Sequence, residues 1–117
     1  MRILLAEDDR TVARGISFIL QQARMVVDTA ETGAEAMELS KLYDYDAIIM
    51  DVMLPDAEGF DIVRRMRNAK NSAPILMLSG QAKAEHKIKG LNAGADDYLE
   101  CDPSDVNRTE FPNAVET

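Results

Sequence analysis

The sequence contains only one cysteine and no long apolar run. Cys101 has no partner for an intramolecular disulfide, which agrees with a reducing compartment. The apolar runs cover about four to six residues, well short of the ~20 that a helix needs to cross a bilayer. No basic segment followed by an apolar one opens the chain, because Met1 runs directly into Arg2 and a strand-like stretch. A cytoplasmic protein without membrane contact is therefore expected.

Basic charge is also scarce, since 13 Lys and Arg residues stand against 21 Asp and Glu residues, for a net charge of −8. The charge is unevenly distributed. Residues 100–117 carry five carboxylates and one arginine, a net of −4. Such an acidic domain is not expected to bind nucleic acid on its own.

Several common binding motifs are missing. The chain has no glycine-rich loop ending in Gly-Lys-Ser/Thr for nucleotide phosphates, and no Cys and His pairs with zinc spacing. A calcium loop that begins at Asp51 would need an oxygen side chain at position 53, where the sequence has Met53. Nothing in the chain suggests a substrate cap or a second catalytic acid or base, so a hydrolase with an Asp nucleophile is disfavoured.

The pattern that is present alternates short apolar runs with stretches of helical spacing. At 117 residues, 46% hydrophobic and 29% charged, the chain suits one globular domain. The strand-like runs are Arg2–Ala6, Met25–Thr29, Asp46–Met50, Pro74–Leu78 and Asp97–Glu100. Helices are predicted over about 10–23, 33–42, 57–69 and 83–93. This alternation predicts a doubly wound α/β fold around a five-stranded parallel sheet.

Acidic residues follow the predicted strands. Asp8 and Asp9 follow the first strand and Asp51 follows the third, while Ser79 follows the fourth. The carboxyl ends of parallel strands share one edge, where such sheets bind ligands. Three carboxylates gathered there repel one another unless a cation intervenes, and oxygen ligands suit Mg²⁺. Asp8 or Asp9 could instead cap the helix at 10–23. A solvated loop residue is the alternative for Asp51, and it is weaker there because apolar residues lie on both sides of it.

Four segments then point to a family. They are ILLAEDD near the start, DAIIMDVMLPDAEGFDIVRRMR around Asp51, PILMLSG, and GLNAGADDYL. In this order and spacing, residues 1–100 resemble the receiver domain of response regulators, the CheY-like phosphoacceptor family with a flavodoxin-like fold. The phrases MRILLAEDD, KLYDYD and GADDY resemble the CtrA-type cell-cycle regulators of alphaproteobacteria.

The resemblance implies a role for each matching residue. Asp51 matches the phosphorylated aspartate, Asp8 and Asp9 the metal-binding acidic pair, and Met53 the residue that offers its backbone carbonyl to Mg²⁺. The remaining matches are Ser79 to the hydroxyl that hydrogen-bonds the phosphoryl group, Tyr98 to the switch aromatic, and Pro55 and Gly59 to the loop after the phosphoacceptor. Ser79 could instead cap a helix, and Tyr98 could be an aromatic at the edge of the core.

The implied function is two-component phosphorelay signalling rather than enzymatic turnover. A histidine kinase or a histidine phosphotransfer protein would donate the phosphoryl group, with Mg²⁺ bound, and the change would be read at a partner-binding surface. Regulation of transcription would then require an output domain.

The sequence departs from the family after Tyr98. Cys101 stands where a lysine is expected beside the phosphoryl group, and aligning Pro103 with the family's proline puts Asp102 there instead, so neither alignment supplies a lysine. Phosphorylation or its coupling to Tyr98 is therefore predicted to be impaired, while the metal site is retained. A pseudo-receiver that binds partners without efficient phosphorylation is the alternative function. Residues 1–103 are assigned to the receiver domain and 104–117 to an atypical segment in place of the last helix. Pro112 lies within that segment, so a weak or absent helix is expected, with homodimerisation as one way to cover the sheet.

Overall fold

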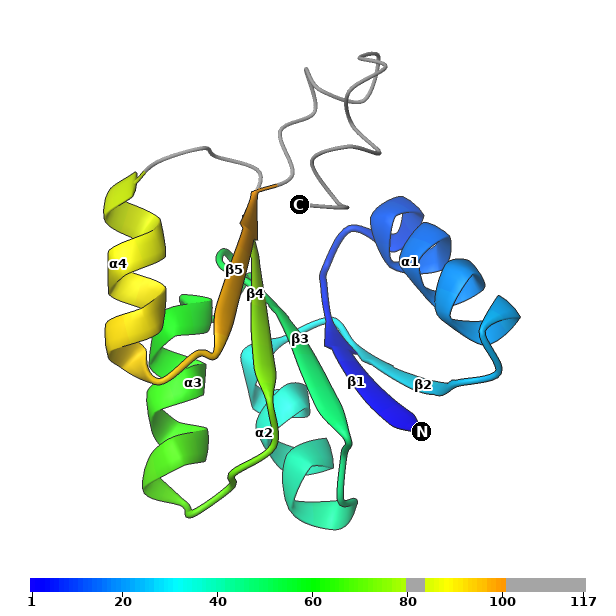
Figure 1. The fold of residues 1–117 in the computed structure, drawn as a ribbon, viewed down its shortest axis with the longest axis horizontal. Coiled ribbons are helices and arrows are strands. Elements are labelled where there is room, and N and C mark those ends of the chain that lie inside the picture. Colours follow the sequence, from blue (N-terminus) through cyan, green and yellow to red (C-terminus); the bar gives the residue numbers. More distant parts are fainter. Residues whose placement is uncertain (80–83, 101–117) are drawn as a thin grey trace.

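A computed structural model of the chain describes residues 1–79 and 84–100. Strands and helices alternate through these residues, as the sequence predicts (Figure 1). The strands are β1 (Arg2–Ala6), β2 (Val26–Ala30), β3 (Ala47–Asp51), β4 (Ile75–Ser79) and β5 (Asp97–Glu100). The helices are α1 (Arg10–Gln22), α2 (Gly33–Leu42), α3 (Gly59–Asn68) and α4 (Ala84–Ala93).

All neighbouring strands in the sheet are parallel, in the order β2-β1-β3-β4-β5. This confirms the predicted doubly wound sheet. After β1 the chain moves outward to β2, and it then returns past β1 to form β3. The two connections that leave β1 and β3 therefore run in opposite directions. Sheets of this strand order bind ligands at that switch point, beyond the carboxyl ends of β1 and β3.

The core lies between the sheet and helices α2, α3 and α4, which cover the same face (Figure 1). The predicted apolar positions of α3 are confirmed, because Phe60, Val63 and Met66 are almost fully buried. Met50 and Met77 reach the same core from β3 and β4, and both are fully buried. Each such side chain contributes about 1.5–3 kcal/mol to folding through removal of apolar surface from water.

The apolar positions of α1 and α4 differ from those of α3. Val12 and Ile19, which belong to the regular apolar spacing of α1, are 38% and 68% exposed. In α4, Ile88 is 61% exposed. Among the α4 residues from 88 onward, whose side chains the structure describes, the buried ones are the small residues Gly90 and Ala93. A Cβ atom at Gly90 would lie 3.2 Å from the Tyr98 ring, so the missing side chain lets the helix approach β5 closely.

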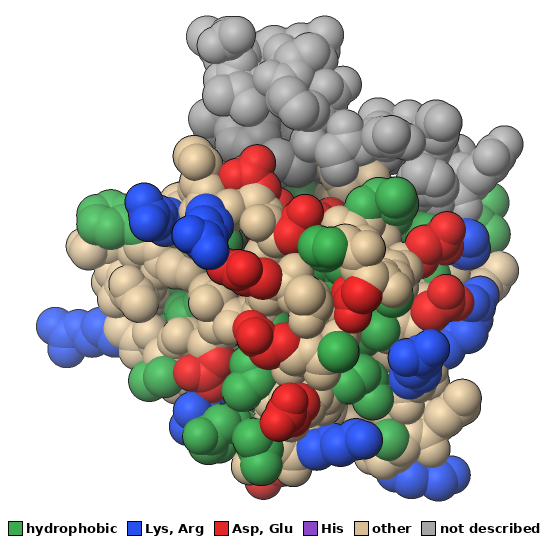
Figure 2. Space-filling view, turned by 180° about the vertical axis from the view of Figure 1, so that it is seen from behind, with side chains coloured by type: hydrophobic (Ala, Val, Ile, Leu, Met, Phe, Trp, Pro, Cys, Tyr) green, Lys and Arg blue, Asp and Glu red, His purple; other side chains and the backbone are tan. Residues whose placement is uncertain are grey.

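The predictions for Cys101, for the last helix and for the atypical segment 104–117 fall outside the described residues. Within the described part of the chain, no helix is both long enough and apolar enough to cross a membrane. On the face drawn in Figure 2, carboxylate side chains are spread among apolar ones, and basic side chains lie mostly toward the edges. That the domain does not bind nucleic acid alone stays a prediction.

Candidate metal centre

Asp51 is the last residue of β3 rather than the first residue after it. It pairs with Leu78 of β4, and the next amide, that of Val52, donates to the Leu78 carbonyl at 3.0 Å. The sheet therefore holds the backbone on both sides of the Asp51 side chain. The carboxylate itself is half-buried at the edge of the sheet. A functional group on such a rigid element is held in place before any ligand binds.

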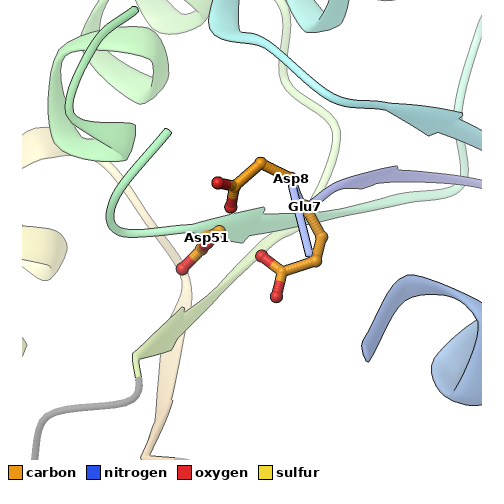
Figure 3. Close-up of side chains that lie close together, drawn as sticks. All are labelled: Glu7, Asp8 and Asp51. Carbon is orange, nitrogen blue, oxygen red and sulfur yellow. The ribbon is translucent and has the colours of Figure 1, made fainter. Parts of the chain in front are cut away.

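Two more carboxylates come from the end of β1. Ala6, its last residue, is paired with Met50 of β3, so the residues that follow β1 lie beside Asp51. Ligand oxygens of Glu7, Asp8 and Asp51 all lie within 4.8 Å of one another. Figure 3 shows these three side chains gathered at the adjoining ends of the two strands. Among the described residues, this group of carboxylates is close enough to share one metal ion.

Asp9, the second member of the predicted acidic pair, has a different role in the structure. It is the N-cap of α1, and its Oδ1 accepts from the amides of Thr11 at 2.9 Å and Val12 at 3.2 Å. The structure thus groups Glu7 with Asp8 and Asp51. The start of the helix is the sequence signal for this role, because a helix that begins at Arg10 has its N-cap at position 9.

The proximity of Glu7 and Asp51 changes their acid–base behaviour. Burial raises the pKa of Glu7 to about 9, and a hydrogen bond and charge repulsion from Asp51 act in the same direction. The pKa of Asp51 is also raised, chiefly by burial. Two carboxyl groups so placed do not both ionise unless a positive charge compensates them. The site therefore favours either a shared proton or a cation.

A divalent cation fits the donor set. Oε2 of Glu7 is buried, and no amide, amine or hydroxyl of the described residues donates a hydrogen bond to it. A buried carboxylate oxygen without a donor is costly unless it contacts a cation. Asp8 is exposed, so water has access to the same place. Carboxylate oxygens with room for waters are the environment that Mg²⁺ prefers.

The loop between β3 and α3 folds back on itself beside the carboxylates. Met53 forms an isolated bridge with Glu58, and the Gly59 amide donates to the Val52 carbonyl at 2.7 Å. The backbone amide of Met53 lies 3.5 Å from Oδ1 of Asp51, and its side chain is 63% exposed. A Cβ atom at Gly59 would lie only 2.1 Å from the backbone oxygen of Asp51, so this close turn requires glycine.

The two remaining predicted site residues lie on β4 and β5. Ser79 is the last residue of β4 and is 3% exposed. It directly follows Leu78, the register partner of Asp51, so it lies near the end of β3. Tyr98, in β5, pairs with Met77 of β4 and is 6% exposed. Its ring packs beside Gly90 of α4. The side chain of Tyr98 is thus directed into the molecule. Its use as a switch stays a prediction.

A 2-1-3-4-5 parallel sheet with carboxylates at the ends of its first and third strands is the architecture of CheY-like receiver domains. The chain belongs to the response regulator receiver domain family, whose family model matches residues 3–107. The domain acts in phosphorylation-based signalling, and these similarities do not favour the pseudo-receiver alternative. Receiver domains are signalling domains that accept a phosphoryl group.

Curated relatives narrow the similarity within the family. The chain is 46% identical over 99 residues to the cell cycle response regulator CtrA of Brucella ovis, and equally to that of Brucella anthropi. The matched residues are 85% of this chain but 43% of those proteins. The chain thus spans less than half the length of these relatives. The sequence-based resemblance to CtrA-type regulators is confirmed.

Solved structures agree with the fold. The receiver domain of Francisella response regulator 1452 superposes with a TM-score of 0.81 at 32% identity, and 85% of this chain and 82% of that one are covered. The BeF3-activated N-terminal receiver domain of Klebsiella pneumoniae RstA gives a TM-score of 0.82 at 28% identity, with 91% of this chain and 92% of that one covered.

Proposed function

We propose that Asp51 is the residue that accepts the phosphoryl group, and that Glu7, Asp8 and Asp51 bind the Mg²⁺ that supports this transfer. Glu7 takes the place in the acidic pair that the family resemblance implies for Asp9. The observation that carries the proposal is the convergence of the three carboxylates within 4.8 Å at the switch point of the sheet. The backbone carbonyl of Met53 is the further metal ligand that the family resemblance implies.

In the proposed phosphoryl transfer, Asp51 is the nucleophile. An Asp51 oxygen attacks phosphorus while the bond from the donor histidine nitrogen to phosphorus breaks, so a phosphohistidine becomes a histidine and Asp51 becomes an acyl phosphate. Bound Mg²⁺ would neutralise negative charge on the phosphoryl oxygens. Asp51 is held by its strand pairing, which reduces the motion that must be lost before attack. We propose that the Ser79 hydroxyl donates to a phosphoryl oxygen and that Tyr98 responds to this contact.

The donor class follows from the family. We propose that a histidine kinase or a histidine phosphotransfer protein phosphorylates Asp51. The named relatives are cell cycle response regulators, and we propose that this receiver serves the same kind of control, with regulation of transcription through an output domain. We also propose that the protein is cytoplasmic and that it can form a homodimer.

Mass spectrometry of the intact chain tests the central proposal. After treatment with acetyl phosphate and Mg²⁺, the wild type is expected to gain one phosphoryl group, and Asp51→Asn is expected to gain none. Asp61→Asn is a matched control, because Asp61 is an exposed carboxylate on α3 that pairs with Arg64. Equal incorporation in wild type and Asp51→Asn would overturn the assignment of Asp51.

A further inference from the structure

The side chain of Asp56 connects the loop after Asp51 to the start of α2. Its Oδ1 accepts from the amide of Gly33 at 2.7 Å, and its Oδ2 accepts from the amide of Ala34 at 3.0 Å. The two partners lie 23 and 22 residues away in the sequence. Both oxygens of one carboxylate are therefore used to hold a second element.

These bonds complete the amino-terminal cap of α2. The first amides of a helix have no partner within the helix. Thr32, the N-cap, accepts from the amide of Glu35 at 3.1 Å, and Asp56 accepts from the two amides before it. A carboxylate at this end is also favoured by the helix dipole. The same amides lower the pKa of Asp56, so the side chain is charged at neutral pH.

The approach of α2 to this region is close. A Cβ atom at Gly33 would lie 2.7 Å from Cδ1 of Ile62 and 3.3 Å from Oδ1 of Asp56. Ile62 belongs to α3 and is 1% exposed. Glycine at position 33 therefore lets the helix start sit directly against the core and against Asp56. The start of α2 is therefore held in place, and it can hold the Asp56 side chain that is hydrogen-bonded to it.

The loop has several connections to its surroundings. Its internal hydrogen bonds, from the Leu54 amide to the Ala57 carbonyl at 3.1 Å and from Gly59 to Val52, set its curvature. The side chains of Val52 and Leu54 are buried in the core, and Glu58 pairs with Lys89 of α4 at 3.1 Å. Met53 is 63% exposed, so packing of its side chain does little to orient the peptide group. Burial of Val52 and Leu54 holds the backbone on either side of Met53, and the bonds from Asp56 to α2 add a further connection two residues after Leu54.

We propose that Asp56 is a positioning residue that anchors the loop to α2 and thereby holds the Met53 carbonyl toward the carboxylates of the metal centre. The inference rests on the proposed function, because the direction of that carbonyl affects ligand binding only if the centre takes a metal. Asp56 does not touch the metal in this scheme. It acts through the loop.

A consequence distinguishes this role from simple support of α2. If the loop and the metal are coupled, binding at one must stabilise the other by the same factor. Saturation with Mg²⁺ should therefore slow amide hydrogen exchange at Gly33 and Ala34. In Asp56→Ala this slowing should disappear, because the link between the two places is cut.

Mg²⁺ titration of the 117-residue chain by calorimetry, well below the unfolding midpoint, provides the test. Asp56→Ala is expected to weaken Mg²⁺ binding about tenfold, the low end of the loss seen when groups that orient metal ligands are removed. Asp56→Asn retains one acceptor oxygen and should be intermediate. Asp61→Ala removes an equal charge from the neighbouring helix and should bind as the wild type does.

The outcomes distinguish a failure of the proposed metal centre from a failure of the positioning role of Asp56. If the wild type does not bind Mg²⁺, the proposed metal centre itself is wrong. If it binds but Asp56→Ala has the same affinity while melting at a lower temperature, Asp56 only stabilises α2 and the positioning role is overturned. An equal loss in Asp61→Ala would attribute the effect to net charge and would overturn it as well.

Discussion

Glu7 and Asp51 face each other across the adjoining ends of β1 and β3, with carboxylate oxygens within 4.8 Å. Their separation is set by the strand register, because Ala6 pairs with Met50 and each carboxylate belongs to the residue that follows. The fold therefore imposes a repulsion that a shared proton or a cation relieves. Asp9, two residues after Glu7, has its carboxylate occupied by the amides of α1 instead.

The first prediction separates the roles of Glu7 and Asp9. Glu7→Gln imitates the protonated carboxyl that the raised pKa of Glu7 favours when no cation is bound, so without Mg²⁺ it should melt no lower than the wild type. It should also lose the rise in melting temperature that Mg²⁺ gives to the wild type, since only a ligand bound to the folded state stabilises it. Differential scanning fluorimetry with and without Mg²⁺ measures both quantities.

Asp9→Ala is the counterpart of this variant. It should lose about 1 kcal/mol of unfolding free energy, because the α1 amides lose their cap. It should retain the rise in melting temperature with Mg²⁺. The reverse pattern, with Asp9→Ala insensitive to Mg²⁺ and Glu7→Gln responsive, would return Asp9 to the acidic pair.

Much of the fold could be predicted because its pattern is local. Continuous apolar runs separated by helical spacing predict the strands within one residue, and α3 packs by the side chains that its spacing indicates. The pattern fails for α4, where exposed Ile88 carries the apolar signal and Gly90 forms the contact. Small residues carry little hydrophobic signal, so packing through them is invisible to periodicity.

The site could be predicted only in part. The gathering of acidic side chains at one edge follows from parallel strands alone, but which of three consecutive carboxylates points inward depends on where β1 ends and α1 begins. The link from Asp56 to Gly33 could not be predicted either. It joins the loop after β3 to the start of α2, and the distance between them depends on the packing of α2 against α3, which nothing local in the sequence encodes.

The second prediction concerns the missing lysine. Cys101→Lys should raise the initial rate of phosphoryl incorporation from acetyl phosphate by about tenfold or more, because a positioned ammonium stabilises charge on the transferring group. Cys101→Ser is the matched control, since it removes the thiol and adds no charge. The rates are followed by intact-mass spectrometry over time. No acceleration by lysine would mean that position 101 is not the site of the family lysine.

The third prediction concerns acid stability at the opposite end of the sheet. Asp28 accepts hydrogen bonds from Nε of Arg2 and from the hydroxyl of Tyr45, each at 2.8 Å. The Arg2 hydrogen bond lowers the pKa of Asp28. Because the folded-state value lies below that of the unfolded chain, the contribution to stability is complete above the unfolded pKa of about 3.9 and is lost as the pH falls through the folded one.

Urea unfolding at a series of pH values measures this effect. The wild type should be more stable than Asp28→Asn near neutrality, and the difference should shrink as the pH falls below 4, where Asp28 takes up a proton. Glu38→Gln, a change at an exposed carboxylate on α2, is the control and should show no such convergence. A difference between wild type and Asp28→Asn that is constant across the whole range would contradict the assigned ion pair.

The fourth prediction uses two glycines in contrasting surroundings. A Cβ atom at Gly59 would lie 2.1 Å from the backbone oxygen of Asp51, so Gly59→Ala must displace either α3 or the end of β3. Around Gly15, in the middle of α1, no atom other than the neighbouring residues and the backbone of the helix itself lies within 4 Å of the added carbon. Gly15→Ala should therefore raise the unfolding free energy by up to about 1 kcal/mol through helix propensity alone.

Gly59→Ala should lower the unfolding free energy by about 1–3 kcal/mol, as for other overpacked sites, and should weaken Mg²⁺ binding in the fraction that remains folded. Mg²⁺ binding should weaken because the added methyl group would press on the backbone oxygen of Asp51, whose side chain is a ligand of the proposed metal centre. Urea titration and calorimetry at low temperature give the two values. Full Mg²⁺ affinity in a destabilised Gly59→Ala would show that the turn supports the fold without controlling the position of Asp51.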